Sequence, residues 1–289
     1  MATRAADTVL VTGASRGIGR AVALHLAGAG LRVFAGVRRR EDGEELAAAG
    51  VGIEPVALDV TADASIEEAR RHVSEASGGS GLLGLVNNAG IATPGPLEHV
   101  TRGELEAQFG VNLFGAVLVT RALLPLLRQA RGRIVNVGAA NATLAMPLMG
   151  ALSASKAALE AVSDALRVEL RGSGVRVALV EPGMTYAESE KEPFAAHVRS
   201  EIDAAIERLP EASRPRYGPA LKRLEALNLR ALARAAPPEE VARRVHHALT
   251  APRPRTRYWC GPDAKLAALL GRFASAGMRD AMWRRTLGL

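Results

Sequence analysis

Two short segments carry residues whose types and spacing could do chemistry. The first is the glycine-rich run Thr12–Gly19, which follows the apolar run Thr8–Thr12 and opens a segment of helical periodicity. Glycines there allow a tight turn and let a phosphate approach the backbone, while free amides at a helix N-terminus attract negative charge. The second is Lys156, one of only four lysines in the chain, on a predicted helix over residues 151–171. The first segment therefore predicts a nucleotide-binding loop, and the second supplies a cation that could act beside it.

The loop and the end of the next strand together predict which nucleotide binds. An acidic residue at the end of the second strand would bind the ribose 2′-hydroxyl of NAD, but this chain has Val37 followed by Arg38, Arg39 and Arg40. Arginine can hold a 2′-phosphate through paired, charge-assisted hydrogen bonds. We therefore expect NADP(H) as the cofactor, held by the loop residues Gly13, Ser15, Arg16, Gly17, Ile18 and Gly19 together with Arg38.

The elements that must position these residues alternate regularly between strand and helix. Apolar β-like runs lie near 8–12, 32–37, 53–58, 82–86, 132–137 and 175–180, and amphipathic stretches lie near 17–29, 63–77, 101–129 and 151–171. Such alternation is typical of parallel strands joined by helical crossovers. The runs are continuously apolar, as expected when both faces of a sheet are buried. The predicted fold class is therefore α/β, a Rossmann-type doubly wound parallel sheet with helices on both faces.

The chain reads as one domain with three parts. Residues 1–183 form the nucleotide-binding core, and residues 184–236 hold two helical patterns, near 193–209 and 219–235, that we expect to form a helical substrate lid. Residues 237–289 form a C-terminal segment with a helix starting at Pro237, a strand over 256–260 and a helical tail over 263–287. A chain of 289 residues can bury one sizeable core, so a single domain is expected.

Composition argues against several other classes of protein. The net charge is +7, but residues 238–289 hold ten Lys/Arg against four Asp/Glu, so most of the excess lies there. No recognition-helix or aromatic-interleaved basic pattern accompanies it, so we expect no nucleic-acid partner. One cysteine permits no internal disulfide, which suits a reducing compartment. We expect no signal peptide, no apolar run long enough to span a bilayer, no membrane partner and no metal site, and hence a cytoplasmic protein.

Four further motifs follow the glycine-rich loop along the chain: Leu58–Val60, Val86–Gly90, Val111–Asn112 and Pro182–Gly183. With the loop, they give the chain a strong resemblance to the short-chain dehydrogenase/reductase family. They cover residues 8–183 in the family's order and spacing, and Gly261–Lys265 resembles a C-terminal form of members akin to retinol and hydroxysteroid dehydrogenases. The resemblance implies that Asn112 and Lys156 are catalytic. It also implies that the cofactor contacts Asp59, Val60, Asn87, Ala89, Gly90, Lys156, Pro182, Gly183 and Thr185.

The resemblance also identifies two departures from the family. Its Tyr-x-x-x-Lys motif places the acid–base tyrosine four residues before the lysine, where this chain has Leu152, and its partner serine thirteen residues earlier than the tyrosine, where this chain has Ala139. This would be an atypical member that lacks both proton-handling side chains. General acid catalysis of that kind contributes roughly 10²–10⁴-fold.

Three interpretations of these departures remain open. The chain is an NADP(H)-dependent ketoreductase with another proton donor, a non-redox cyclase or isomerase with a structural nucleotide, or a binding protein without turnover. For the first, candidate donors are a phenol of the substrate, water on Lys156, and the side chains of Tyr186, Ser153, Asn141 and Thr143. Tyr186 is the preferred side chain, since the start of the lid faces the nicotinamide in the family.

The remaining expectations concern the substrate and assembly. Leu152 and Ala139, with Met146, Leu148 and Met149 nearby, predict an apolar pocket for a bulky hydrophobic or polycyclic ketone, in specialised metabolism. The family commonly associates through the helices that correspond to 101–129 and 151–171, which implies a homodimer or homotetramer.

Overall fold

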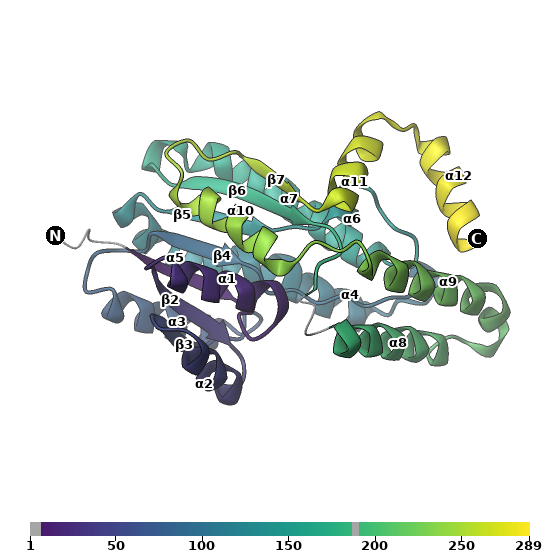
Figure 1. Ribbon diagram of the computed structural model, residues 1–289, viewed down its shortest axis with the longest axis horizontal. Helices are drawn as coiled ribbons and strands as arrows, with labels where there is room; N and C mark the ends of the chain where they lie inside the picture. The colour runs from purple at the N-terminus through teal and green to yellow at the C-terminus, as the bar shows by residue number, and fades with distance from the viewer. Residues whose placement is uncertain (1–6, 187–190) are drawn as a thin grey trace.

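The computed structural model describes residues 7–186 and 191–289, which build a seven-stranded parallel sheet (Figure 1). The strand order is β3-β2-β1-β4-β5-β6-β7, so the chain moves outward in one direction from β1 and in the other from β4. Ligands of such sheets bind at the carboxyl ends of the strands, where the order reverses. The predicted fold class is confirmed. The strands are β1 (Thr8–Thr12), β2 (Arg32–Val37), β3 (Ile53–Ala57), β4 (Gly84–Asn87), β5 (Arg133–Val137), β6 (Arg176–Pro182) and β7 (Arg257–Cys260).

Helices cover both faces of this sheet. On one face, α1 (Gly17–Gly28) and α10 (Pro238–Thr250) pack over a cluster of fully buried strand valines. On the other, α3 (Asp63–Ala76) and α5 (Ala116–Ala130) pack over Leu10, Phe34 and Leu85. Successive residues of a strand point to opposite faces, so a sheet covered on both sides needs apolar residues at every position. This explains the continuous apolar runs in the sequence.

Most predicted elements lie within two residues of their observed bounds, but the helix predicted over 219–235 spans Arg214–Leu232, and two other differences concern residues 1–183. Helix α2 (Arg40–Ala49) was not predicted, because only Gly43 and Leu46 of its residues are buried and no apolar stripe marks it. The expected single helix over 101–129 is divided into α4 (Arg102–Phe109), a π-helical turn η2 (Gly110–Gly115) and α5. α4 begins with a capping box in which Thr101 and Glu104 satisfy each other's backbone amides.

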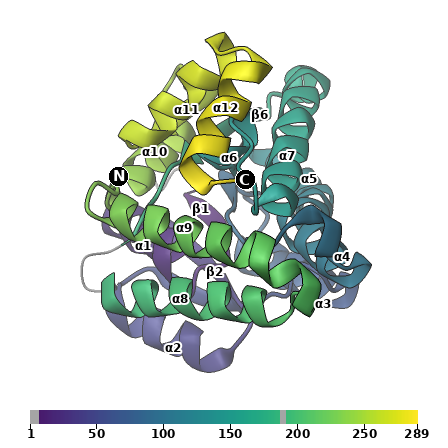
Figure 2. The ribbon, with the colours of Figure 1, turned by 90° about the vertical axis from the view of Figure 1, so that its right-hand side faces the viewer.

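The segment expected to form a lid holds two helices, α8 (Lys191–Glu207) and α9 (Arg214–Leu232). They lie side by side, beyond the carboxyl ends of the strands (Figures 1 and 2). Their shared apolar cluster includes Ile202, Leu221 and Leu224, and Leu148 from the core packs into it. The two helices are therefore held to the core by apolar contacts around the site.

The C-terminal segment follows the prediction up to its last part. After α10 and β7, the expected helical tail divides into α11 (Pro262–Phe273) and α12 (Ala276–Leu287). The break falls at Ala274–Ser275, and the Ser275 hydroxyl caps α12 by accepting a hydrogen bond from the Met278 amide. In Figure 1, α12 stands at the outer edge of the molecule, and α11 lies between it and β7.

One helical stretch contradicts the expectation that no segment is long and apolar enough to span a bilayer. Residues Arg102–Ala130 satisfy that criterion by length and composition, with a mean hydropathy of 1.7 over the best window. This stretch also supplies the core, because Leu123 and Leu127 are fully or almost fully buried against the sheet. Core helices commonly meet the same criterion, so it is weak evidence for a membrane span.

Candidate functional site

The glycine loop between β1 and α1 leaves room where a phosphate would lie. Gly13 has φ +63°, and a Cβ there would come within 2.9 Å of the Ala89 Cα. A Cβ on Gly19 would lie 2.1 Å from the Gly13 carbonyl oxygen, so the helix start and the loop touch through backbone alone. A Cβ at Gly17, with φ +55°, would meet nothing within 4 Å, so this part of the backbone faces open space. With the uncapped amides at the start of α1, this geometry fits a dinucleotide pyrophosphate.

Thr12 and Asn88 hold this loop to the neighbouring strand. The Thr12 hydroxyl accepts 3.0 Å hydrogen bonds from the amides of Asn88 and Ala89. The Asn88 side chain donates 3.0 Å hydrogen bonds to the carbonyls of Thr12 and Gly13. These contacts fix the predicted cofactor residues Gly13 and Ala89 beside each other.

The three arginines after β2 have different surroundings. Arg39 forms an ion pair with Asp42, and Arg40 forms one with Glu44 at 2.7 Å. Arg38 and Arg16 are exposed and make no ion pair with any acidic residue in the described part of the chain. Two of the three arginines therefore stabilise the start of α2, whereas Arg38 and Arg16 remain available to a ligand.

The residues predicted beside the adenosine divide into two groups. Asp59 follows β3, and its Oδ1 accepts hydrogen bonds from the Thr61 amide and hydroxyl at 2.9 and 2.6 Å. These bonds hold the pKa of the carboxyl below its ordinary value, so it is an acceptor at neutral pH. Val60 is buried against Gly115 in the π-helical turn. The Asn87 side chain instead points into the protein and donates to Thr120 and Asn136, so only its backbone can reach a ligand.

Lys156 and Asn112 meet at the carboxyl ends of β4 and β5. Lys156, on α7 (Gly150–Glu169), is 6% exposed, and its Nζ donates a 2.7 Å hydrogen bond to the Val137 carbonyl. Burial lowers the pKa of this ammonium to about 8. A Cβ on Gly90 would lie 3.5 Å from Lys156 Nζ and 3.4 Å from Asn112 Oδ1. The side-chain ends of Lys156 and Asn112 therefore lie close to each other, next to the backbone of Gly90.

Asn112 is fixed by the π-helical turn. Its Oδ1 accepts from the Ile91 amide at 2.8 Å, and its Nδ2 donates to the Ile91 carbonyl and to Ser155 Oγ at 3.0 and 3.1 Å. Gln108, one turn earlier and fully buried, also donates to the Ile91 carbonyl and accepts from the Thr93 amide. The turn thus holds the loop after β4 in two places.

The residues around Lys156 offer few free hydroxyl groups. Leu152 lies one helical turn before Lys156, and Ala139 precedes the short helix α6 (Ala140–Thr143). Among the candidate donors, Ser153 accepts from the Met146 amide at 3.3 Å, and Thr143 donates to Glu160 at 3.3 Å. The side-chain oxygen of Asn141 is buried and has no hydrogen-bond partner among the described residues. Ser153 and Thr143 are therefore engaged in local structure.

The loop before α7 contains a strained residue. Leu148 has φ +65°, a conformation that costs a non-glycine residue about 1 kcal/mol or more. Its carbonyl accepts a 2.7 Å hydrogen bond from the Gly95 amide, and its side chain is 5% exposed within the lid cluster. Met146 and Met149 pack against the same cluster. The loop beside Leu152 is thus apolar and continuous with the lid.

A residue from the C-terminal segment holds the Pro182–Gly183 turn. Asp263 Oδ2 accepts a 2.6 Å hydrogen bond from the Met184 amide, and Oδ1 accepts one from its own helix at the Ala264 amide. Thr185 donates to the Gly183 carbonyl at 3.2 Å. Tyr186 is 8% exposed and stacks on Phe194 of α8 at 6.3 Å between ring centroids. The predicted residues Gly183, Thr185 and Tyr186 therefore lie on one turn that leads into the lid.

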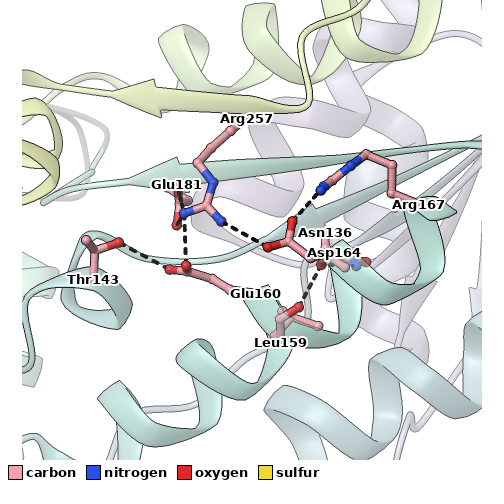
Figure 3. Close-up of polar contacts among 9 residues, drawn as sticks. Asn136, Thr143, Leu159, Glu160, Asp164, Arg167, Glu181 and Arg257 are labelled. Atoms are coloured by element: carbon pink, nitrogen blue, oxygen red, sulfur yellow. Dashed lines mark hydrogen bonds and ion pairs between the residues drawn. The ribbon is translucent and has the colours of Figure 1, made fainter. Parts of the chain in front are cut away.

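Next to this turn lies a partly buried group of charged residues that includes Glu181, Glu160 and Arg257 (Figure 3). Glu181, the residue before Pro182, is fully buried and contacts the backbone of Gly138. Arg257 of β7 lies 2.9 Å from Glu160 and 3.5 Å from Glu181, so one guanidinium contacts both carboxyl groups. Burial raises the pKa of the Glu181 carboxyl, and the adjacent Glu160 raises it further. Glu181 is thus neutral under conditions in which an exposed glutamate is ionised.

Sequence reasoning missed Glu181, Asp263 and Gln108. Glu181 had a visible signal, since it is the only charged residue in the strand segment Val177–Pro182, and an acid in a fully buried strand requires a partner. Asp263 lies in the segment Gly261–Lys265 that carries part of the resemblance, but nothing in the sequence pointed to its partner Met184, 79 residues away. Gln108 had no signal, because its partner Ile91 lies 17 residues away.

Comparison with known proteins agrees with this geometry. A family model described as short chain dehydrogenase matches residues 7–197. The chain is 38% identical over 288 residues to retinol dehydrogenase 5 of Homo sapiens, covering 95% of this chain and 86% of that protein. It is 36% identical over 253 residues to the uncharacterized oxidoreductase YbbO of Escherichia coli K12, covering 87% and 84% of the two chains.

Two solved structures resemble the whole chain. A short-chain dehydrogenase from Streptomyces avermitilis superposes with a TM-score of 0.78 at 29% identity, covering 98% of both chains. A short chain dehydrogenase from Burkholderia cenocepacia in complex with NADP gives 0.70 at 27% identity, covering 97% of both. This chain belongs to the short-chain dehydrogenase/reductase family, whose members among its relatives are oxidoreductases.

Proposed function

We propose that this protein is an NADP(H)-dependent oxidoreductase that reduces a ketone on a bulky hydrophobic or polycyclic substrate and takes its proton from a group other than a tyrosine. One contrast within the site carries the proposal. The nucleotide half and Lys156 keep the contacts that a reductase needs, whereas Leu152 and Ala139 stand where the family places its tyrosine and serine. We therefore infer an atypical site in which binding and hydride delivery are retained and proton delivery is changed.

The cofactor assignment rests on Arg38 and Arg16. Both are exposed beside the loop and unpaired with described acids, whereas Arg39 and Arg40 are engaged by Asp42 and Glu44. Guanidinium groups favour the 2′-phosphate of NADP(H) over the hydroxyl of NAD(H). The Burkholderia structure solved with NADP supports this choice. NADP(H), when bound, supplies the hydride.

Lys156 is the group we assign as the source of the proton, either directly or through a water. Its ammonium has a pKa of about 8, so it is charged at neutral pH but gives up a proton more readily than an exposed lysine. Its bond to the Val137 carbonyl fixes Nζ beside Gly90 and Asn112. Asn112 acts as a positioning residue, because it holds Ile91 and Ser155. Tyr186 is the second candidate donor.

The class of substrate follows from the walls of the site and from the relatives. The loop with Leu148, the lid helices α8 and α9, and Leu287 of α12 form one apolar cluster, and Met149, three residues before Leu152, packs against it. Such a wall suits a large apolar molecule with few polar groups. Retinol dehydrogenases 5, 7 and 16 are among the relatives. Helices α8 and α9 would then act as the lid over this substrate.

Two other functions would be consistent with the loss of the acid. A cyclase or isomerase would use the pocket to shape a substrate and keep the nucleotide as a structural part. A binding protein would hold nucleotide or ligand without turnover. The similarity to oxidoreductases over most of the chain favours redox chemistry over both.

The experiment that separates these functions uses NADPH deuterated at the transferable position. The protein is incubated with a panel of cyclic ketones, retinal and quinones, and products are read by mass spectrometry. We expect deuterium in a product, with the rate reduced at least tenfold in Lys156→Met. A product isomeric with its substrate and intact NADPH would replace the proposal by the cyclase or isomerase. Tight NADPH binding without any product from the panel would favour the binding protein.

We further propose a homodimer or homotetramer in the cytoplasm, acting without nucleic acid. The outward faces of α5 and α7 expose Phe114 just before α5, at 55%, and Val168 on α7, at 71%. Light scattering of the wild type and of Val168→Glu would test this arrangement: a lower mass for the variant supports it, and a monomeric wild type contradicts it.

A further inference from the structure

Helix α11 exposes its large apolar side chains to solvent and buries its small ones, which is the reverse of the usual pattern in a globular protein. The side that packs on the molecule carries small residues, with Ala264 and Ala267 buried and Gly271 against Thr143. The side that faces outward carries Leu266, Leu269 and Phe273, which are 54, 55 and 71% exposed. Their spacing of three and four residues places them on one face of the helix. A helix that served only the core would bury its leucines and expose its alanines.

The next helix and the end of the chain add two more exposed apolar side chains. Met278 at the start of α12 is 63% exposed, and Leu289 at the end of the chain is 42% exposed. Half of the ten large apolar side chains that are exposed in the described chain therefore lie within its last 24 residues. We refer to these five exposed side chains, Leu266, Leu269, Phe273, Met278 and Leu289, as the C-terminal apolar face. α11 and α12 are also the outermost elements at their end of the molecule (Figures 1 and 2).

The charges around this face have one sign. Residues 264–289 hold Lys265, Arg272, Arg279, Arg284 and Arg285 against a single acid, Asp280. None of these five cations forms an ion pair with an acidic residue in the described ranges. The Arg272 guanidinium lies 5.4 Å from the centre of the Phe273 ring, so charge and apolar surface are adjacent. Exposed leucine and phenylalanine flanked by arginine and lysine is the pattern of a helix that lies in a membrane interface.

We propose that α11 and α12 dock the protein onto an anionic lipid surface, with the C-terminal apolar face inserted among the acyl chains and the flanking arginines and Lys265 against the headgroups. The charge distribution argues against a second copy of this chain as the occupant. A two-fold interface sets the same patch against itself, which would oppose five cations to five cations. An anionic membrane is complementary to both parts of the surface.

This docking would also place the lid at the membrane. Trp283 and Leu287 of α12 pack into the same cluster as Leu221 and Leu224 of the lid helix α9. A hydrophobic substrate dissolved in the bilayer could then enter beside α12 without crossing water. That consequence rests on the proposed function, whereas lipid binding does not and can be measured without turnover.

The test is flotation of the full-length protein with two kinds of vesicle. Vesicles of phosphatidylcholine alone are compared with vesicles that contain about one third phosphatidylglycerol. We expect the wild type to float with the anionic vesicles and the bound fraction to fall with rising salt. Phe273→Glu and Leu269→Glu should each weaken partitioning at least tenfold, and Lys265→Gln with Arg272→Gln should remove the preference for anionic vesicles. Val51→Glu is the matched control, since Val51 is 96% exposed at a remote turn.

Outcomes that overturn the proposal are equally specific. The substituted side chains are exposed, so the variants should unfold at the wild-type temperature, which thermal denaturation checks. A wild type that does not float, or a Phe273→Glu variant that floats as well as Val51→Glu, would remove the membrane as the partner. Light scattering without lipid tests whether a second copy of the chain covers the C-terminal apolar face instead. A lower molecular mass for Phe273→Glu than for wild type would show that it does. Loss of flotation with unchanged turnover on soluble ketones would leave the proposed function intact.

Discussion

The carboxylate of Asp263 accepts a 2.6 Å hydrogen bond from the backbone amide of Met184, 79 residues earlier in the chain. The same carboxylate occupies the place that a side chain on Gly183 would need, since a Cβ there would lie 2.0 Å from Oδ1. The turn that follows β6 is thus held by the first turn of α11. Its position depends on the C-terminal segment as well as on the sheet.

Replacement of Asp263 by alanine should loosen this turn and weaken cofactor binding. A hydrogen bond to a charged group is worth about 1.5–3 kcal/mol, so we expect NADPH affinity to fall roughly 10–100-fold in Asp263→Ala. Fluorescence titration measures the affinity, and Asp280→Asn on α12 is the control. Gly183→Ala should be severe alone and milder in the Asp263→Ala background, because the clash disappears. Wild-type affinity in Asp263→Ala would show that the turn is held by other contacts, such as the Gly183 amide to the Cys260 carbonyl.

Introducing the family's tyrosine and serine at positions 152 and 139 should reveal whether the site still positions a ketone. We expect the pair Leu152→Tyr and Ala139→Ser to raise reduction of simple cyclic ketones by roughly 10²–10⁴-fold, the usual contribution of a general acid. The control replaces Leu152 by phenylalanine together with Ala139→Ser, which adds the ring without the hydroxyl. Stopped-flow oxidation of NADPH gives both rates. Equal rates for the two pairs, with NADPH binding intact, would mean that the pocket no longer holds a ketone at that position.

Lys156 should make stability rise with pH in the alkaline range. Burial lowers the pKa of its ammonium in the folded state to about 8, below the value of 10.5 expected in the unfolded chain. Between these values the unfolded chain binds more protons, so the free energy of unfolding increases with pH, by up to about 3 kcal/mol. Below pH 8 the cost of burying the charge is fully present. Urea unfolding of wild type and Lys156→Met from pH 7 to 10.5 checks this, and parallel curves would contradict it.

Glu181 should have the opposite effect near neutral pH. Its folded-state pKa is raised, first by burial and then by Glu160, so the folded chain holds a proton that the unfolded chain releases. Stability is therefore full below the ordinary carboxyl pKa and falls as pH rises toward the raised value. We expect wild type to lose roughly 1–3 kcal/mol more than Glu181→Gln between pH 5 and pH 8. Glu44→Gln, at an exposed position on α2, controls for the loss of one charge. If the stability of Glu181→Gln changed with pH as that of wild type does, Glu181 would not hold the proton in the folded state.

Sequence reasoning reached the sheet and the nucleotide half because both depend on local patterns. The apolar runs predicted β1 to β6, and Gly13, Gly17 and Gly19 predicted a loop whose geometry needs glycine. It did not reach the contacts that join distant segments, such as Asp263 with Met184 or Arg257 with Glu181, since no period in the sequence encodes them. The arginines show the same limit: three consecutive residues look alike, and only their neighbours Asp42 and Glu44 separate Arg38 from the other two.

The π-helical turn Gly110–Gly115 makes the site sensitive to the number of residues between α4 and α5. A π-turn contains one residue more than the α-helix it interrupts, and each residue of an α-helix advances the side chains by about 100°. The wide turn takes up this extra residue, so α4 before it and α5 after it keep nearly the phase of one regular helix. Loss of any single residue between 110 and 115 would restore a regular α-helix and remove the wide turn that contains Asn112. The Asn112 amide would then leave the position from which it contacts both Ile91 and Ser155. The site therefore depends on the length of this turn, and a deletion there would be more damaging than most substitutions.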